Sequence, residues 1–389
     1  MDINEIKKVA IIGAGAMGHG IAQTCAMAGY KTIIKDVKQD FLDNAISKIT
    51  ASLDFLVSKN KISAEDKEEI LANRLSVTLD TSEAVGDAQV VIEAVPEILN
   101  LKKEIFKDVS DKAPENAILA SNTSTMRITD IASEVKLPGR FVGMHFFNPV
   151  TKMKLVEIIK GEQTEDQYVT LLTEIVHKIK KFPVTVLKDS PGFIVNRINA
   201  PNQALMNAVL DEGKIKPGEI DTVMKRMGIP MGPFELADFV GLDVYSHTLE
   251  YYAQTLSPEY KPGKVIEKLI ADGKLGMKTG QGIYKWNGEK PEIDNSTPSA
   301  DIAAKEFLSI QLNEAVKVFK EGIAASTQEI DQAVMHGMRA FAGPFALCAG
   351  MTPEQVTEPL MQLKERFKLD IFAPEPELQD GSFKQLSNK

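Results

Sequence analysis

Residues 9–36 read VAIIGAGAMGHGIAQTCAMAGYKTIIKD, and this stretch decides the fold. It opens with a short apolar run at 9–12 and closes with a second at 32–34, both rich in β-branched residues. Between them lie the spacing GxGxxG and a helix-like segment that Gly29 can end. The order strand, glycine-rich turn, helix, strand is typical of the first unit of a doubly wound parallel sheet.

Each glycine of the turn has its own physical role. Gly13 permits a tight turn, Gly15 lets a pyrophosphate approach the backbone, and Gly18 lets the helix pack close to the sheet. The helix N-terminus also directs partial positive charge at the phosphates. A ligand-free α/β domain with a glycine-rich turn is the alternative. We expect a dinucleotide at Gly13, Gly15, Ala16, Met17 and Gly18.

An acidic residue, Asp36, stands 23 positions after Gly13, at the end of the second strand. A carboxylate there would accept hydrogen bonds from the adenosine ribose hydroxyls. The 2′-phosphate of NADP would meet its negative charge, so we expect the cofactor to be NAD.

Apolar runs alternate with helix-like segments as far as residue 187. This alternation predicts an α/β fold with a Rossmann-type, doubly wound and mostly parallel sheet. Beyond residue 191 the pattern becomes helical, apart from a short strand-like run at 282–286. We expect further strands at 89–95, 117–120, 141–145, 154–159 and 185–187, and helices at 101–109 and 166–180.

An internal repeat divides the helical part into two tandem modules. EID at 219–221 precedes GPF at 232–234, and the same motifs recur at 329–331 and 343–345. Residues 288–300 are polar and contain proline, which is typical of a linker. We expect an NAD-binding Rossmann domain at 1–188, a helical domain at 189–290 and its second copy at 299–389, with the two copies packed together.

Composition excludes several classes of function. The net charge of −9 argues against nucleic-acid binding, which needs a dense basic surface. Cys25 and Cys348 are too few for a disulfide framework, and no Cys/His cluster suggests a metal site. The chain has no apolar run of membrane-spanning length, and its start lacks the pattern of a signal peptide. We therefore expect a cytoplasmic protein without metal, membrane or nucleic-acid partners.

One histidine, His145, lies in the apolar stretch RFVGMHFFNPVTKMKLVEII at 140–159, and Glu157 follows twelve positions later. A lone histidine on an apolar strand is more often structural than catalytic. A strand–turn–strand return would instead place the carboxylate beside the imidazole. Ser124 and His145 both lie near the carboxyl ends of expected strands, where such sheets bind ligands.

The chain resembles the L-3-hydroxyacyl-CoA dehydrogenase family, which includes bacterial 3-hydroxybutyryl-CoA dehydrogenases. This resemblance implies NAD-dependent oxidation of (S)-3-hydroxyacyl-CoA to 3-oxoacyl-CoA, and the reverse reaction, in fatty acid metabolism. The motifs that carry it are IIGAGAMGHGIAQTCAMAG (11–29), SNTS (121–124), HFFNPVTKMKLVEII (145–159), DSPGFIVNR (189–197), PMGPFELADFVGLD (230–243) and GMKTGQGIY (276–284).

The resemblance also implies residue roles. His145 and Glu157 match the catalytic pair, Ser124 the serine that hydrogen-bonds the substrate oxygen, and Asn196 the asparagine near the substrate carbonyl. A capping hydroxyl, a helix-surface amide and a solvated helix face are the alternatives for Ser124, Asn196 and the coenzyme A positions. Matches to NAD-contacting positions are Glu97, Lys102, Asn148 and Lys278, and matches to positions contacting coenzyme A are Ser52, Lys59 and Ser124.

Two other functions stay open at this point. One is a related NAD-dependent dehydrogenase of a free hydroxy or sugar acid, similar to L-gulonate enzymes. The other is a non-catalytic NAD-binding or structural protein. In relatives with a duplicated helical module, the second copy resembles the partner subunit of single-copy dimers. The resemblance therefore implies a monomer with an in-chain pseudo-dimer, or a homodimer, acting on an acyl-CoA.

Asp36 yields a test of cofactor choice. The protein should use NADH with a higher kcat/KM than NADPH, and a neutral replacement of Asp36 should narrow the difference because the repulsion of the 2′-phosphate is lost. Steady-state rates with both cofactors measure this. Equal kcat/KM values in the unmutated protein would show that Asp36 is wrongly assigned, and measurable NADPH turnover would point to compensation by Lys38.

Overall fold

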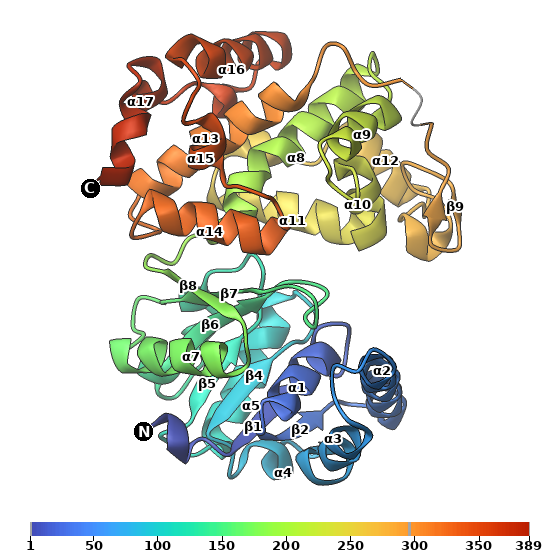
Figure 1. Ribbon diagram of the computed structural model, residues 1–389, viewed down its shortest axis with the longest axis vertical. Helices are drawn as coiled ribbons and strands as arrows, with labels where there is room; N and C mark the ends of the chain where they lie inside the picture. Colours follow the sequence, from blue (N-terminus) through green and yellow to red (C-terminus); the bar gives the residue numbers. More distant parts are fainter. Residues whose placement is uncertain (1, 295–296, 389) are drawn as a thin grey trace. The chain divides into compact units, whose positions relative to one another are not determined.

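The first part of the chain forms an α/β unit around one eight-stranded sheet (Figure 1). The computed structural model describes residues 2–294 and 297–388. The strands lie in the order β3-β2-β1-β4-β5-β6-β7-β8. They are β1 (Lys8–Ile12), β2 (Lys31–Lys35), β3 (Leu75–Thr78), β4 (Val90–Glu93), β5 (Ile118–Ser121), β6 (Phe141–Phe146), β7 (Leu155–Ile159) and β8 (Phe182–Val186).

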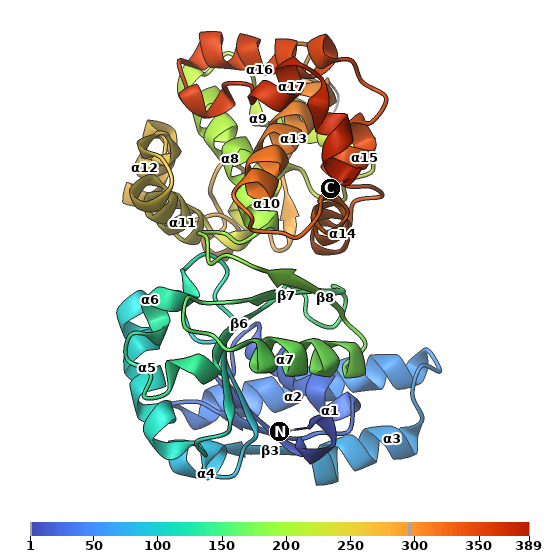
Figure 2. The ribbon, with the colours of Figure 1, turned by 90° about the vertical axis from the view of Figure 1, so that its left-hand side faces the viewer.

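Helices cover both faces of the sheet, with α1, α2 and α7 on one side and α4, α5 and α6 on the other (Figure 2). Alternate strand residues such as Ile11, Ile92 and Met144 belong to the core that contains α1, α2 and α7. Burial on both faces explains why the strands read as nearly continuous apolar runs. The helices are α1 (Gly18–Met27), α2 (Gln39–Ser58), α3 (Ala64–Glu69), α4 (Thr81–Val85), α5 (Leu99–Lys112), α6 (Ile128–Ala132) and α7 (Asp166–Lys178).

The strand order reverses direction between β1 and β4, which are neighbours in the sheet. In open α/β sheets the ligand lies beyond the carboxyl ends of the strands at such a switch point. The glycine-rich turn follows β1 directly, and the loop containing Glu97 follows β4. The topology therefore places two groups of expected site residues at the same crevice.

Every neighbouring pair in this sheet is parallel except β6 and β7. These two strands run antiparallel, with Gly143 opposite Ile159 and His145 opposite Glu157. The prediction of a doubly wound, mostly parallel sheet is confirmed. All the expected strands of this unit are present, although the strand expected at 185–187 is the end of the longer β8, which stops at Val186.

One strand, β3, was not expected from the sequence. Only Leu75 and Val77 of its four residues are apolar, so it offers no continuous apolar run. It lies at the edge of the sheet and pairs only with β2 among the described strands. An edge strand has one neighbour instead of two, so its sequence carries a weaker signal of burial.

The rest of the chain is mainly helical, as predicted. Contacts divide the molecule into two compact units: one runs to Phe193 and includes Met335–Arg339, and the other comprises Ile194–Val334 and the chain from Ala340 onward. None of the helices within the described ranges is long and apolar enough to cross a membrane. The helices are α8 (Val195–Glu212), α9 (Pro217–Arg226), α10 (Pro233–Val240), α11 (Leu242–Thr255), α12 (Lys264–Ala271), α13 (Ala304–Lys320), α14 (Thr327–Met338), α15 (Pro344–Cys348), α16 (Pro353–Phe367) and α17 (Pro376–Gln379).

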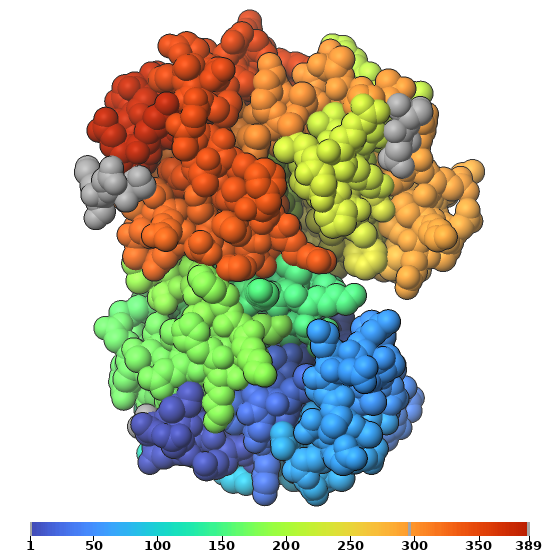
Figure 3. All heavy atoms as spheres, viewed as in Figure 1, coloured from blue at the N-terminus to red at the C-terminus, as the bar shows by residue number. Residues whose placement is uncertain are grey.

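Both expected helical modules contribute to this second unit. Helix α13 packs against α8, and it also packs against α15 and α16. Figure 3 shows the orange and red atoms of the C-terminal part next to the yellow-green atoms around α9. Of the expected linker 288–300, residues 295–296 lie outside the described residues, and β10 (Lys290–Pro291) forms a small antiparallel pair with β9 (Trp286–Asn287).

The strand expected at 282–286 differs from the structure. Only Trp286 of that run belongs to β9, and Lys285 before it makes one isolated bridge, with Gln281. The buried carboxylate of Asp238 accepts hydrogen bonds from the Ile283 and Tyr284 amides and from the Trp286 indole. A side chain therefore satisfies the backbone groups that a second strand would otherwise bind.

The repeated EID and GPF motifs share one structural role. Asp221 accepts hydrogen bonds at 3.0 Å from the amides of Phe234 and Glu235, at the start of α10. Asp331 accepts hydrogen bonds at 2.9 Å from the amides of Phe345 and Ala346, at the start of α15. In both modules an aspartate from one helix satisfies the free amides at the beginning of another.

Candidate active site

The glycine-rich turn has the geometry that a bound phosphate requires. Gly13 has a φ of +109°, and a Cβ on it would lie 2.6 Å from the carbonyl oxygen of Ala94. A Cβ on Gly18 would lie 1.8 Å from the carbonyl oxygen of Gly13. Gly15, in contrast, is exposed, and no atom lies within 4 Å of its Cβ position. The turn is closed where it meets the sheet and open where a pyrophosphate would approach.

The carboxylate of Asp36 ties this turn to the end of β2. One oxygen, Oδ2, accepts a 2.6 Å hydrogen bond from the amide of Ala14, and Oδ1 accepts one of 2.6 Å from Val37. Ala16 is exposed and Met17 half-buried on the same turn. The structure thus brings the expected cofactor residues from Gly13 to Asp36 together around one open stretch of backbone.

A buried ion pair lies at the end of the neighbouring strand β4. The Lys102 ammonium is 2.7 Å from Oε1 of Glu93 and 3.1 Å from Oε2 of Glu97. Lys102 is 1% exposed and Glu93 is 0% exposed. Burial lowers the pKa of Lys102, but the two carboxylates outweigh burial and raise it above its ordinary value. Lys102 therefore stays charged and neutralises two acids inside the unit.

Glu93 was missed in the sequence, although one signal was available. It is an acidic residue inside the apolar run QVVIEAV, and a buried carboxylate needs a partner. Its partners are Lys102, the Ser121 hydroxyl at 2.6 Å and the Val95 amide at 2.7 Å. Glu93 thereby joins the ends of β4 and β5 to helix α5.

Glu97 holds the loop that carries Ser124. Its Oε1 accepts a hydrogen bond from the Thr123 hydroxyl, and it accepts bonds from the amides of Ser124 at 2.9 Å and Thr125 at 3.3 Å. Burial raises the pKa of Glu97, but Lys102 and these donors outweigh burial and hold the pKa below its usual range. Glu97 is thus an ionised anchor for the backbone at Ser124.

Asn122 connects the same loop to the strand that contains the histidine. Its Oδ1 accepts a 2.8 Å hydrogen bond from the amide of Phe146, at the end of β6. Its own amide donates a 2.9 Å hydrogen bond to the carbonyl oxygen of Glu93. One asparagine therefore ties the ends of β4, β5 and β6 together, on the side of the sheet where Ser124 and His145 lie.

His145 and Glu157 form a buried hydrogen-bonded pair. Nδ1 of His145 lies 2.7 Å from Oε2 of Glu157, and the residues are 4% and 0% exposed. The two residues face each other in the antiparallel β6–β7 register, which explains their spacing of twelve. The ring centroids of Phe147 and Phe193 lie 4.3 and 5.8 Å from the centroid of the imidazole. When Nδ1 donates to Glu157, Nε2 is left without a proton and can accept one.

Two of the expected coenzyme A residues, Ser52 and Lys59, lie in α2 and directly after its end, in different surroundings, whereas Ser124 lies in the loop after β5. Ser52 faces helix α1, where its hydroxyl accepts a 2.9 Å hydrogen bond from the Gln23 amide. Lys59 follows the last residue of α2 and is exposed, with Nζ 5.6 Å from the centre of the Phe55 ring. Asn148 is also exposed and forms a cis peptide bond with Pro149.

Two expected site residues belong to the second compact unit. Asn196 lies in the first turn of α8 and is half-buried. The Lys278 ammonium lies 2.5 and 2.6 Å from the two carboxylate oxygens of Asp243. Burial raises the pKa of Asp243, but the Lys278 ammonium and backbone donors outweigh it and lower the pKa.

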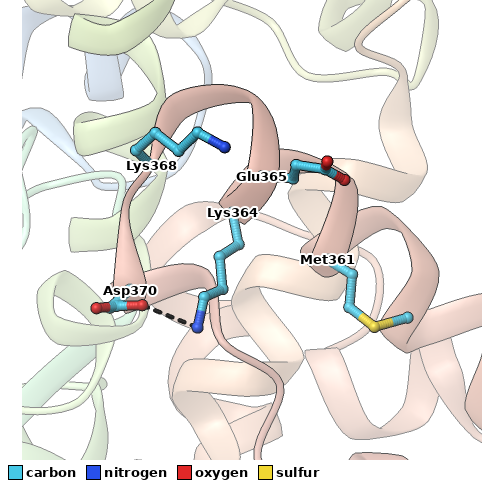
Figure 4. Close-up of a pocket in the computed structure, with 5 residues that line it drawn as sticks. All are labelled: Met361, Lys364, Glu365, Lys368 and Asp370. Carbon is cyan, nitrogen blue, oxygen red and sulfur yellow. Dashed lines mark ion pairs between the residues drawn. The ribbon is translucent and has the colours of Figure 1, made fainter.

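A surface cavity of about 420 Å³ lies elsewhere in the second unit, at the end of α16 (Figure 4). Within it, Lys364 pairs with Asp370 at 2.8 Å. The described residues include no cluster of three or more acidic, histidine or cysteine side chains able to hold a metal ion. None of the expected site residues lines the cavity, which is formed by Met361, Lys364, Glu365, Lys368 and Asp370.

Two family models match consecutive parts of the chain. The NAD binding domain of 3-hydroxyacyl-CoA dehydrogenase matches residues 8–190, and the C-terminal domain of the same enzyme matches residues 192–286. A probable 3-hydroxybutyryl-CoA dehydrogenase of Deinococcus radiodurans is 40% identical over 283 residues, which cover 72% of this chain and 100% of the relative.

Two further proteins match most of the chain. The fatty acid oxidation complex subunit alpha of Idiomarina loihiensis is 37% identical over 355 residues, which cover 86% of this chain. The match spans only 49% of that relative's length. The crystal structure of 3-hydroxybutyryl-CoA dehydrogenase from Escherichia coli has a TM-score of 0.85 at 28% identity, and the match covers 98% of this chain and 99% of that one.

The buried lysine yields a test of stability. Lys102→Met should lower the free energy of unfolding by about 3–5 kcal/mol at pH 7, because it leaves buried carboxylates without their counter-charge. The loss should shrink as the pH falls, since protonation of a carboxylate that has lost its partner removes the unpaired charge. Urea denaturation between about pH 3.5 and 7 measures both effects, because this range spans the ordinary titration of carboxylates at about pH 4.

Lys107→Met is the matched control on the same helix. Lys107 is exposed, and its ammonium is 3.7 Å from Glu134. Removing it should change stability little, because exposed ion pairs contribute little. Equal effects of the two substitutions would contradict a structural role for Lys102.

Proposed function

The chain belongs to the 3-hydroxyacyl-CoA dehydrogenase family, and we propose that it moves a hydride between NAD and C3 of a 3-hydroxyacyl-CoA. The observation that carries this proposal is the buried His145–Glu157 pair, which lies in the same unit as the dinucleotide turn. A structural histidine would not need an ionisable partner. A base that must take up a proton and hold the charge does need one.

His145 acts as the general base in this proposal. Its Nε2 accepts the proton of the substrate hydroxyl while the hydride leaves C3. The Glu157 carboxylate, 2.7 Å from Nδ1, holds the ring in the correct tautomer and stabilises the imidazolium that forms. In the reverse direction the same imidazolium returns its proton to the oxygen of the 3-oxo group.

The residues at the switch point fit NAD. The open backbone at Gly15 leaves room for the pyrophosphate, and the start of α1 directs backbone amides toward it. Asp36 has oxygen lone pairs that remain available for ribose hydroxyls beside its two backbone hydrogen bonds. NAD, when bound, supplies the nicotinamide carbon that accepts the hydride. Glu97, Lys102, Asn148 and Lys278 are the further cofactor positions that we propose.

Polar side chains complete the substrate site. Ser124 would donate a hydrogen bond to the reacting oxygen, from a loop that Glu97 anchors. Asn196 would bind the carbonyl side of the substrate, and Ser52 and Lys59 would contact coenzyme A. Rates with acetoacetyl-CoA and NADH, compared with free acetoacetate and NADH, test the substrate class. Faster turnover of the free acid would favour a dehydrogenase of free hydroxy or sugar acids.

We also propose that residues 299–389 are a second copy of the helical module at 189–290. The matching roles of Asp221 and Asp331 support this. A Cβ on Gly232 would lie 2.3 Å from the Asp221 side chain, and one on Gly343 would lie 2.3 Å from the Asp331 backbone. The packing of α13 on α8 would then substitute for a partner subunit, which favours a monomer.

The cellular setting is part of the same proposal. Cys25 and Cys348 are both unbonded and buried. Burial raises the pKa of each thiol to about 12, which disfavours the reactive thiolate. A protein that works with reduced cysteines suits the cytoplasm, where we place it.

Removing the base should separate catalysis from cofactor binding. His145→Gln should lower kcat by about 10²–10⁴-fold with little change in NAD affinity, because the proton then has no acceptor. Glu157→Gln should also lower kcat and displace the pH–rate profile, since the imidazolium loses its charged partner. Steady-state kinetics and NADH fluorescence titration measure these effects. If both variants kept activity within a few-fold of the unmutated protein, His145 would have a structural role and not a catalytic one.

Deleting the second copy tests the pseudo-dimer. A chain that ends at Gly288 would expose the face of α8 that α13 covers, so it should dimerise or aggregate while the full chain stays monomeric. Light scattering coupled to size-exclusion chromatography compares the two chains. If the shortened chain were monomeric, soluble and as heat-stable as the full chain, the second copy would not act as an in-chain partner.

A further inference from the structure

A buried arginine links the two helical modules. Arg197 is 7% exposed, and its Nε donates a 2.5 Å hydrogen bond to Oε1 of Glu314. Its Nη2 donates a 3.0 Å hydrogen bond to Oε1 of Glu321. Glu314 is 2% exposed. A buried guanidinium is stable only when such partners compensate its lost hydration, so the cluster holds Arg197 in one position.

The proposed repeat shows that the carboxylate of Glu314 must come from the second copy. Helices α8 and α13 begin at Val195 and Ala304, and each helix leads into a Glu-Gly pair whose glycine is 213 or 322. The two starts and the two glycines are both 109 positions apart. At this offset Leu205 of α8 corresponds to Glu314 of α13. The first copy has an aliphatic residue at the position where the second has the acid. A second chain that offered its first copy to α8 could not supply this carboxylate.

Arg197 also stands next to a proposed site residue. It directly follows Asn196 in the first turn of α8. The residue at the N-cap position is Ile194, whose aliphatic side chain cannot cap a helix. The first turn therefore depends on other contacts to keep its position, and the cluster around Arg197 provides a strong one. Neighbouring residues in a helical turn share one rigid backbone, so a restraint on Arg197 also restrains Asn196.

We infer that Glu314, assisted by Glu321, is a positioning residue for catalysis. Through Arg197 it holds the turn that presents Asn196 to the substrate. The second copy, which carries none of the proposed catalytic residues, would thus complete the active site of the first. This inference rests on the proposed function, because that proposal assigns Asn196 to the substrate carbonyl.

A second ion pair between the modules provides a matched control. At the other end of α8, Glu212 accepts hydrogen bonds from Arg366 of α16, at 3.1 Å from Nε and 2.5 Å from Nη2. It joins the same two modules but lies sixteen positions after Asn196. If the substitutions acted only by weakening the attraction between the modules, replacing either glutamate would lower kcat/KM by a similar factor.

The test compares Glu314→Gln and Glu212→Gln in the full chain, at a temperature where circular dichroism shows both to be folded. Glu314→Gln should lower kcat/KM for acetoacetyl-CoA by about tenfold or more, because small misplacements of a positioning group are costly. NADH affinity should not change. Glu212→Gln should leave kcat/KM within about twofold of the unmutated protein, a range we take as ordinary for a remote surface pair.

A double-mutant cycle with Asn196→Ala separates positioning from general destabilisation. If Glu314 acts through Asn196, Glu314→Gln should cost less than about threefold once Asn196 is absent, since coupled residues are not additive. Full additivity in kcat/KM, or an equal loss in Glu212→Gln, would overturn the inference. If Glu314→Gln does not fold, Glu321→Gln should show the same coupling to Asn196 with a smaller loss of kcat/KM. Absence of that coupling would also overturn the inference.

The same experiments distinguish a failure of this inference from a failure of the proposed function. Loss of activity in Asn196→Ala and His145→Gln without coupling to Glu314 would leave the dehydrogenase proposal intact and remove only the role of the second copy. Undiminished activity in Asn196→Ala would show instead that the substrate site itself is wrongly assigned.

Discussion

The reversal of one strand is the constraint on which the candidate active site depends. Parallel neighbours need a crossover of about a dozen residues or more. Only eight residues separate β6, which ends at Phe146, from β7, which begins at Leu155. The chain must therefore return antiparallel, and this return sets Glu157 directly opposite His145. The carboxylate of Glu157 is 0% exposed, and a buried carboxylate needs a hydrogen-bonding partner. The short connection between β6 and β7 supplies that partner by placing His145 opposite it.

Short-range patterns made much of the fold predictable. The turn around Gly13 and the apolar strands could be identified because their roles depend on residues close in sequence. The edge strand β3 could not, because Leu75 and Val77 alternate with polar residues and only one neighbour buries them. The EID and GPF motifs were visible as a repeat, but nothing in the sequence said that Asp221 and Asp331 bind the amides of the GPF helices.

The residues of the candidate site also fall into those that the sequence predicted and those that it did not. The spacing of twelve between His145 and Glu157 and the family resemblance pointed to a pair that the structure then places at 2.7 Å. The charge partners of Lys102 and Arg197 were not predictable. The resemblance implied only a cofactor contact for Lys102, and Arg197 and Glu314 are 117 positions apart in the sequence. Long-range compensation of buried charge depends on tertiary packing, which no local pattern reports.

The position of Asp36 has a practical consequence for protein engineering. Each of its two oxygens accepts a hydrogen bond from a backbone amide, one from Ala14 in the glycine-rich turn and the other from Val37 after β2. A designer who removes this carboxylate to admit a phosphorylated cofactor also removes the brace of the turn that must receive the pyrophosphate. Affinity for any dinucleotide would then fall together with selectivity. A successful redesign would have to replace the brace and the charge separately, for instance with a neutral acceptor at the same place and a new cation further along the loop.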